Sequence, residues 1–507
     1  MCNLRKSPLS QDDDYDNYKK KTTPLPWMQL AIVYLIQFAE PLTATVIYPF
    51  INQYVRETGI TKGDERNTGY YAGIIQSAFF FAEAAAVVPL GMASDRFGRR
   101  PILLLGPLGL AFTMLGFGAS TRFLPLVFFR CMQGIFNGNI GISKSVISEI
   151  TDSTNIADAF SFTPVVWTSG VTIGPFIGGI LAQPADRWPG VFGKLVYFRS
   201  HPYFLPCLAA SFLAFSIFLT SLIALRETLS SALNGQAPTY KSKSSPSSST
   251  TNLVADDDVP PRYGSTETTH CPLLNPELEN GRGSPSDDDG PFSLRDLLKS
   301  RDIQIVLINW GYVAFCDMSV QVLTPLMWST SIEHGGLGFS PYAIGMTMGT
   351  YGLLSAFLQV TFLGKIIKRF GPRRVHITCF SSLIVSSLSF PVASFFARRS
   401  GRTDWTVWTM VIISLASQSM RAGAYGAMMV IITGVAPNRS SLGTVNGVGQ
   451  AVGSITRSLG PSFASSLHSI SLQRQLAGGN GVYYIMTVIV VIGVRLTFML
   501  PKKLRLV

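Results

Sequence analysis

The stretch that decides the fold is a short basic segment between two long apolar runs, Gly91-Met-Ala-Ser-Asp95-Arg96-Phe97-Gly98-Arg99-Arg100. A similar stretch occurs 273 positions later, Gly364-Lys-Ile-Ile-Lys368-Arg369-Phe370-Gly371-Pro-Arg373-Arg374. Both read G-x-x-x-[DK]-R-F-G followed by basic residues, and both come after a pair of apolar runs. A repeat of this kind indicates that the chain contains two copies of one structural unit.

The composition around this repeat is that of a chain that faces lipid. Of the 507 residues, 47% are hydrophobic and only 14% are charged, where soluble proteins average about 25% charged residues. The charged residues are also unevenly distributed along the chain, with 9 in residues 1–26, 20 in residues 226–302 and 3 in the last six. The long middle stretches therefore carry too little charge for a surface covered by water, and the bilayer is the expected surrounding.

Twelve apolar windows have the length of about 20 residues that a helix needs to cross a bilayer. Backbone polar groups cannot stay unpaired in lipid, so these windows must be helical. They centre on residues 28–50, 69–93, 101–119, 123–144, 159–183, 203–225, 303–327, 341–367, 375–397, 405–433, 441–467 and 481–500.

The distribution of basic residues predicts the orientation of these spans. With the N-terminus in the cytosol, 26 of the 41 Lys and Arg residues fall in cytosolic segments and 11 in outer loops, as the positive-inside rule requires. The net charge of +12 is then mostly a topogenic signal, and nucleic acid is not an expected partner. We expect a multi-pass protein of the plasma membrane or the vacuolar membrane with both termini in the cytosol.

The spans divide six and six around a polar central segment. That segment is rich in Ser and Pro, with acidic triplets at Asp256–Asp258 and Asp287–Asp289, and such a composition does not support a packed core. A tether between two bundles is favoured over a phosphorylation platform. The expected organisation is a cytosolic tail, a six-helix bundle, a disordered linker, a second bundle and a cytosolic tail, at 1–26, 27–225, 226–302, 303–500 and 501–507.

No pattern of a metal site, a cofactor site or an enzyme emerges. The six cysteines and five histidines are scattered without C-x-x-C or H-x-H spacing, and no nucleophile with a nearby base is clustered on the loops. We therefore expect no cofactor, no metal and no catalytic residues.

Other pairs of features repeat in register with the basic segments. The offsets are 277, 286 and 291 positions, close to the 273 of the basic segments, which supports an internal duplication. The pairs are Glu40 with Asp317, Gly174 with Gly460, and Arg130 with Arg421.

Three motifs in these positions resemble those of the major facilitator superfamily. The basic segment matches that family's cytosolic gate motif through Gly91, Asp95, Arg96, Gly98, Arg99 and Arg100. The span-4 motif R-x-x-Q-G is matched by Arg130, Gln133 and Gly134. The span-5 antiporter motif G-x-x-x-G-P-x-x-G-G is matched by Gly170, Gly174, Pro175, Gly178 and Gly179.

The sequence looks most like the drug:proton antiporter branch, close to fungal relatives of plant zinc-induced facilitators and bacterial tetracycline exporters. The Glu227-Thr228-Leu229 run after the sixth span is typical of that branch. The resemblance implies an all-α membrane protein of twelve transmembrane helices in two six-helix bundles. It also implies that Asp95 acts as a charge latch against a helix of the other half. Lys368 replaces the acidic residue in the second copy, so only the first copy can have that role.

Ionisable groups inside the membrane are costly and are functional candidates by default. In the implied fold, spans 1, 4, 7 and 10 line a central cavity, and each carries one such group: Glu40, Arg130, Asp317 and Arg421. Glu40 is the leading proton site, with Arg130 as its expected electrostatic partner and Asp317 as a weaker second site. Glu83 in span 2 is equally compatible with titration and with structural pairing, and Arg457 is a further cavity charge.

Polar residues at helical spacing extend these sites along single helix faces. A stripe of polar residues at helix interfaces is the alternative interpretation. The substrate-cavity candidates are Gln37, Asn137, Asn309, Gln321, Tyr351, Gln359, Asn446 and Gln450.

The function expected from these features is proton-coupled export of a small organic solute by alternating access. Its partners would be the solute, protons and the bilayer, and the chain would act as a monomer. A facilitator or proton symporter, and a non-transporting membrane sensor, remain as alternatives. The sequence does not identify the substrate.

Overall fold

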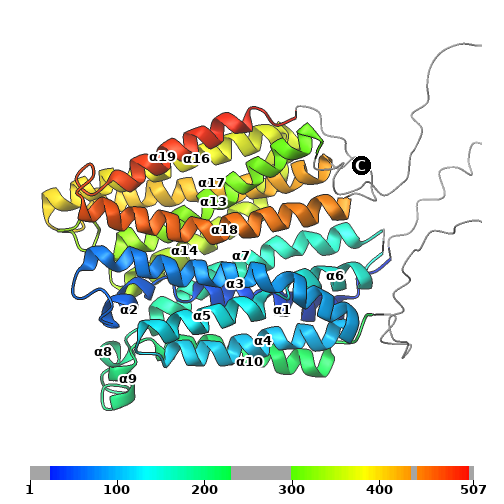
Figure 1. Cartoon of the computed structure of the whole chain (residues 1–507), viewed down its shortest axis with the longest axis horizontal. Coiled ribbons are helices and arrows are strands. Elements are labelled where there is room, and N and C mark those ends of the chain that lie inside the picture. The colour runs from blue at the N-terminus through cyan, green and yellow to red at the C-terminus, as the bar shows by residue number, and fades with distance from the viewer. Residues whose placement is uncertain (1–22, 153, 230–298, 436–441, 502–507) are drawn as a thin grey trace, which may run out of the picture.

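The computed structural model describes residues 23–152, 154–229, 299–435 and 442–501, and the regular structure in these segments is helical, without strands. Figure 1 shows the helices running along one common direction. The first half of the chain forms α1 (Trp27–Thr45), α2 (Ile51–Glu57), the 3-10 turn η1 (Glu65–Asn67), α3 (Thr68–Phe97), α4 (Arg99–Gly118), α5 (Phe123–Asn137), α6 (Ile140–Ile150), α7 (Ile156–Leu181), α8 (Pro184–Arg187), α9 (Val196–Ser200) and α10 (Phe204–Ala224).

The second half repeats this arrangement with fewer breaks. It forms α13 (Arg301–Ser329), α14 (Pro341–Leu358), the π-helical turn η2 (Gln359–Leu363), α15 (Gly364–Phe370), α16 (Pro372–Ser400), α17 (Trp405–Gly434), α18 (Leu442–Gln473) and α19 (Gly481–Thr497).

The twelve predicted spans coincide with these helices. Three of them are built from more than one helical segment, namely α1 with α2, α5 with α6, and α14 with η2 and α15. On length and hydropathy alone, seven helices in the described segments qualify as membrane spans. The others are shortened by breaks, like α5, or carry polar residues in mid-helix, like α17 and α18. The predicted all-α fold of twelve transmembrane helices in two bundles is confirmed.

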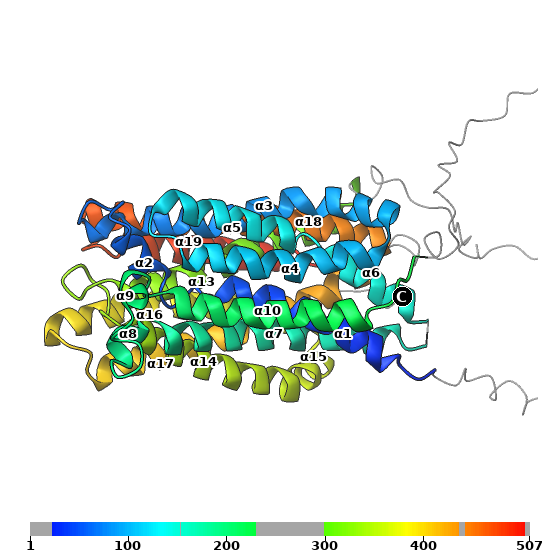
Figure 2. The same cartoon turned by 90° about the horizontal axis from the view of Figure 1, so that it is seen from below.

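The two halves lie side by side, and the views in Figures 1 and 2 agree on this. Helix α3 of the first half packs along α18 of the second, and α7 packs along α14. The end of α19, the start of α1 and the loop between α6 and α7 lie at one end, which we call the terminal end. Helices α2, α8 and α9 lie at the opposite end, which we call the distal end.

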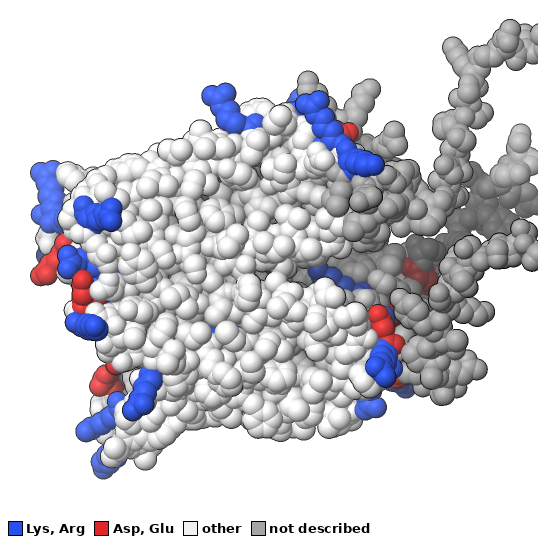
Figure 3. Space-filling view, viewed as in Figure 1, with Lys and Arg blue, Asp and Glu red and all other residues white. Residues whose placement is uncertain are grey.

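The molecular surface fits a bilayer setting. On the face in Figure 3, acidic and basic side chains gather toward the two ends, and the broad middle is almost without them. Many large apolar side chains of the helices are exposed, among them Phe112, Phe212 and Ile412. Contiguous apolar surface on this scale is expected of a protein embedded in lipid rather than in water.

The repeated basic segments have the same backbone geometry. Gly98 ends α3 with φ of +101°, and Gly371 ends α15 with φ of +81°, a left-handed region that glycine enters without steric cost. Arg100 then donates to the carbonyl of Leu222 at 2.7 Å, and Arg373 donates to the carbonyl of Phe498 at 2.6 Å. The second copy therefore keeps the turn and its link to the last helix of its half, although it lost the acidic residue.

The glycines of the predicted span-5 motif allow α7 to approach two neighbours closely. A Cβ atom on Gly170 would lie 2.5 Å from Pro41, and one on Gly178 would lie 1.9 Å from the carbonyl oxygen of Val46. A Cβ atom on Gly179 would lie 2.5 Å from the Cα atom of Gly345 in α14. No side chain fits at such distances, so this stripe fixes α7 against α1 and, across the two halves, against α14.

Polar contacts between the halves gather at the distal end. Ser462 donates its backbone N–H to Ser77 at 3.0 Å, and Tyr70 donates its own to Ser469 at 3.2 Å. Toward the terminal end, Figure 3 shows a hollow between the halves with a basic side chain inside it. The structure therefore represents a form that is closed at the distal end and open at the terminal end.

Most of the predicted tails and linker lie outside the described residues. Of the predicted linker 226–302, the structure describes only residues 226–229 and 299–302. Residues 226–229 do not leave the bundle at once but lie against the start of α4, as detailed below.

Candidate functional site

Two buried carboxylates form the centre of the first half. Glu40 on α1 is 5% exposed and Glu83 on α3 is 4% exposed. The two groups interact electrostatically, and the amide of Asn137, at the end of α5, lies beside both. Sequence reasoning left the role of Glu83 open, and the structure brings it next to Glu40.

Two cations act on this carboxylate pair from different directions. Lys144 of α6 and Arg457 of α18 both interact electrostatically with Glu40 and with Glu83. Arg457 belongs to the second half of the chain, and its guanidinium donates to its own helix at Gly453 and to Ser454. The charge balance of the carboxylate pair therefore depends on how the halves are placed relative to each other.

Several buried polar atoms around the pair have no hydrogen-bond partner in the described part of the protein. They are Glu83 Oε2, Gln37 Oε1, and both amide atoms of Asn137. Gln37 uses its amide nitrogen to donate to Ser143 at 2.9 Å. Buried groups are normally paired, so unpaired atoms gathered in one place mark a site that a proton, water or ligand can complete.

Arg130 does not pair with Glu40 in this structure, contrary to the sequence-based expectation. Its guanidinium lies over the Phe79 ring at 4.4 Å and donates to Gln133 at 2.7 Å and to the carbonyl of Ala44 at 2.9 Å. The expectation was wrong because adjacent helices do not specify which rotamer a long side chain takes. Gly134, in the same motif, lets α5 approach the carbonyl of Phe79.

The second half carries its own charge pair. Asp317 of α13 forms an ion pair with Arg421 of α17. The hydroxyl of Tyr425, one turn along α17, interacts electrostatically with both. Asp317 therefore has a fixed cationic partner here, whereas Glu40 has another carboxylate as its neighbour.

A small cavity of about 40 Å³ lies next to this charge pair, between the halves. Such a volume holds one or two water molecules. Two of the predicted cavity residues, Gln321 and Tyr351, line it together with Arg421. Residues that the sequence did not single out complete the lining: Val171, Thr324, Met348, Gly352, Leu415 and Gln418.

Other predicted cavity residues are placed differently. Asn309 donates to Ile305 and to Leu496 within its own half, which is a structural role. Gln359 lies in the π-helical turn and donates to Ser355 at 3.0 Å. Gln450 is partly buried on α18, and the side chain of Asn446 lies outside the described residues.

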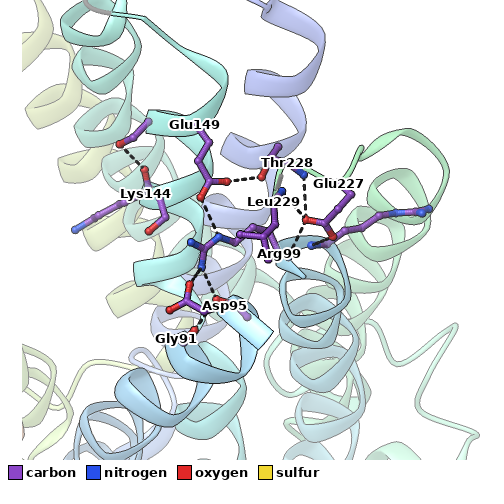
Figure 4. Close-up of polar contacts among 12 residues, drawn as sticks. Gly91, Asp95, Arg99, Lys144, Glu149, Glu227, Thr228 and Leu229 are labelled. Carbon is purple, nitrogen blue, oxygen red and sulfur yellow. Dashed lines mark hydrogen bonds and ion pairs between the residues drawn. The ribbon is translucent and has the colours of Figure 1, made fainter. Parts of the chain in front are cut away.

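The gate motif forms an ion network at the terminal end, which Figure 4 shows in detail. Arg99 lies at its centre and donates to Asp95 at 2.5 Å, to Ser94 at 2.7 Å and to Glu149 of α6 at 3.0 Å. These contacts lie within the first half, and the Asp95 side chain is 64% exposed. In the form open at the terminal end, Asp95 is thus held by Arg99 and faces solvent.

The carboxylate of Glu227 caps the N-terminus of α4. It was not assigned a structural role from the sequence. Its carboxylate accepts from the backbone N–H groups of Arg99 at 2.9 Å and Arg100 at 3.0 Å, and from those of Thr228 and Leu229 at 3.0 Å each. Burial by itself raises the pKa of Glu227, but these four N–H groups outweigh it and lower the pKa below its ordinary value.

Glu149, Lys144 and Tyr425 are residues of the candidate site that the sequence analysis did not single out. Lys144 was counted only as a topogenic charge, although it is a lone cation near the end of an apolar run. Glu149 follows about one and a half turns later on the same helix. Its sequence position alone does not show that it lies near the gate motif, because that depends on where α6 ends in the fold.

Comparisons with known proteins agree with this architecture. The family model for the Major Facilitator Superfamily matches residues 33–194 and 272–505. The chain is 32% identical over 505 residues to the major facilitator-type transporter psiT2 of Psilocybe cyanescens, covering 96% of this chain and 93% of that protein.

Two further relatives have names that bear on function. The multidrug transporter mfsB of Aspergillus fumigatus is 28% identical, with 88% of this chain and 79% of that protein covered. Protein ZINC INDUCED FACILITATOR 1 of Arabidopsis thaliana is 29% identical, with 93% and 91% covered.

Among solved structures, a bacterial homolog of the human lysosomal transporter Spinster superposes with a TM-score of 0.64 at 15% identity, covering 95% of this chain and 97% of that one. This likeness shows the same fold. The family and these relatives are transporters rather than enzymes, and the resemblance inferred from the motifs is confirmed. The chain is an integral membrane transporter that belongs to the major facilitator superfamily.

Proposed function

We propose that this transporter exports a small organic solute in exchange for protons, by alternating access between its two halves. The observation that carries the proposal is the buried pair of Glu40 and Glu83 with its unpaired polar atoms. The relatives of this chain, one of which is named a multidrug transporter, support an exported organic substrate.

The pair has the chemistry of a proton site. Two neighbouring carboxylates out of water can hold one proton between them, since both cannot be ionised at low cost. Arg457 reaches the pair from the other half, so its influence changes when the halves rock. A proton would be retained when the cation moves away and released when it approaches, which couples protonation to the conformational change.

We further propose the organisation expected from the basic residues. The terminal end faces the cytosol, the segments 27–225 and 303–500 move as two bundles, and residues 226–302 tether them. The form described here, open at the terminal end, would then be the one that takes solute from the cytosol. The transporter would act as a monomer in the plasma or vacuolar membrane.

The test is transport in sealed proteoliposomes with an imposed pH gradient. Efflux of a panel of organic solutes is measured for the parent, Glu40→Gln and Glu83→Gln. We expect gradient-driven transport to fall at least about tenfold in both variants, because one proton site is lost, while exchange of solute without a gradient persists. Asp186→Asn, which changes an exposed carboxylate on α8 at the distal end, is the matched control and should behave like the parent.

The same assay separates the alternatives. Transport by the parent that ignores the pH gradient would contradict proton coupling and favour a facilitator. Solute movement in the same direction as the proton would favour a symporter. Absence of any transport over a broad panel, with protein that is correctly folded, would favour a sensor.

A further inference from the structure

A charged cluster at the distal end joins the two halves. In the first half it consists of Arg56, at the end of α2, and Glu65, at the start of η1, which form an ion pair. In the second half it consists of Ser329, Ser331 and His334, in the segment that follows α13. We call these five residues the distal latch.

Both members of the ion pair form hydrogen bonds to the backbone of the second half. Arg56 Nη2 donates to the carbonyl oxygen of Ser329 at 3.1 Å, which lies at the C-terminus of α13, where the helix dipole favours a cation. The backbone N–H of Ser331 donates to Glu65 Oε1 at 3.0 Å. One Arg–Glu pair thus satisfies both an acceptor and a donor of the opposite half, and it can do so only while the distal end is closed.

His334 of the second half lies next to this ion pair. His334 Nδ1 lies 3.7 Å from Glu65 Oε2 and 2.9 Å from Ser331 Oγ. Asp64 of the first half also interacts with His334 electrostatically and is itself paired with Arg66.

The remaining charged groups around His334 come from its own half. The Arg398 guanidinium of α16 packs on Gly335 and donates to the carbonyl of Gly478, and Glu333 next to His334 is exposed. Asp64 and Glu65 each have an arginine partner in the first half, and Glu65 Oε2 is the carboxylate oxygen within ion-pair distance of His334. A proton on His334 therefore adds an ion pair between the halves.

We propose that Arg56 and Glu65 are a latch that holds the distal end closed, and that protonation of His334 strengthens this latch. The proposal rests on alternating access as set out above. The side chains of Arg56, Glu65 and His334 are 23%, 21% and 35% exposed, so the solution at the distal end reaches them. Acid in that compartment then favours the form open at the terminal end, which is the form that loads solute.

The experiment measures the distance between the halves directly, without relying on transport. Spin labels are placed at Arg122 and Arg402, which are exposed distal residues of the first and second half, after the six native cysteines have been replaced. Double electron–electron resonance then gives the populations of closed and open distal ends in lipid nanodiscs. The pH is varied over the range of about 5 to 8 in which histidine side chains in general change charge.

For the latch, Glu65→Gln and Arg56→Gln should lower the closed-to-open ratio about tenfold, because each removes a charge-assisted hydrogen bond across the halves. Glu65→Asp should restore part of it. Asp186→Asn is the matched control, since Asp186 is an exposed carboxylate at the distal end of the first half. An unchanged ratio in Glu65→Gln, in monodisperse protein, overturns the latch.

For the pH effect, lowering the pH should raise the closed-to-open ratio of the parent about two- to fivefold, the size expected of a partly exposed ion pair. His334→Gln should remove this response, and His201→Gln, at another distal histidine, should keep it. A response that survives in His334→Gln overturns the role of His334. Transport that ignores the pH gradient while the distances respond as expected would instead refute the proposed proton coupling and leave the latch standing.

Discussion

At the scale of single residues, Glu227 links three parts of the terminal end. Its carboxylate occupies the N-terminus of α4, where unpaired N–H groups and the helix dipole favour a negative charge. A Cβ atom on Gly98 would lie 2.6 Å from Glu227 Oε2, so glycine is required there for space as well as for its φ. The neighbouring Thr228 donates to Glu149 at 2.5 Å, which ties the chain after α10 to the gate network.

We predict that Glu227→Gln lowers the free energy of unfolding by about 1 kcal/mol, as loss of a charged helix cap does. The pKa of Glu227 is lowered in the folded protein. Its stabilisation is therefore full above the ordinary value of 4.5 and is lost as the pH falls below that value through the lowered pKa. Thermal unfolding in detergent should show the parent and variant converging on acidification. A difference that stays constant down to the lowest pH would contradict the charge-based explanation.

At the scale of elements, the stripe of small residues on α7 sets how closely the halves can approach. A Cβ atom on Gly179 would lie 2.5 Å from the Cα atom of Gly345. Further along, Gly349 packs on Phe176 and Gly352 packs on Thr172. Small residues allow such close packing of membrane helices, which is driven by van der Waals contact rather than by the hydrophobic effect. Helices α7 and α14 can therefore separate without breaking hydrogen bonds or ion pairs at these glycine contacts.

We predict that Gly345→Val pushes α14 away from α7 and favours the form open at the distal end. The added side chain has no space, since a Cβ atom there would lie 2.4 Å from the Cα atom of Gly179. The distance distribution between labels at Arg122 and Arg402 should shift to longer values. Gly447→Ala on α18, where a Cβ atom meets nothing within 4 Å, is the matched control. An unchanged distribution in Gly345→Val would mean that this contact does not govern closure.

At the scale of the whole molecule, the two ends use different devices. The distal end is closed by contacts across the halves, while the gate network at the terminal end holds Asp95 within the first half. Asp95 is then available to contact the second half when the terminal end closes, as the family resemblance implies. Under the proposed alternating access, the distal gate is engaged in this form and the terminal gate is disengaged.

We predict that the terminal end faces the cytosol. Single cysteines at Lys62, in the distal segment before α3, and at Arg369, at the end of α15, are both exposed positions. In intact cells or vacuoles, a membrane-impermeant maleimide should label them from opposite sides, with Arg369 reached only from the cytosol. Labelling of both positions from the same side would contradict the topology drawn from the basic residues.

The sequence by itself determined the number, the helical nature and the pairing of the spans. Hydropathy over windows of bilayer length leaves no alternative to helices, because lipid offers no partner to an unpaired backbone group. The duplicated R-F-G segments predicted two equivalent halves, and the matching φ values of Gly98 and Gly371 confirm that the repeat is structural.

Only the tertiary structure decided which buried charges meet. Glu40 lies beside Glu83 rather than Arg130, Glu149 joins the gate motif, and Arg56 and Glu65 grip the opposite half. These contacts depend on the rotation of each helix about its axis and on the rotamers of long side chains. Such choices are fixed by packing between segments far apart in the sequence, and helical periodicity along one span specifies only the face on which a residue lies.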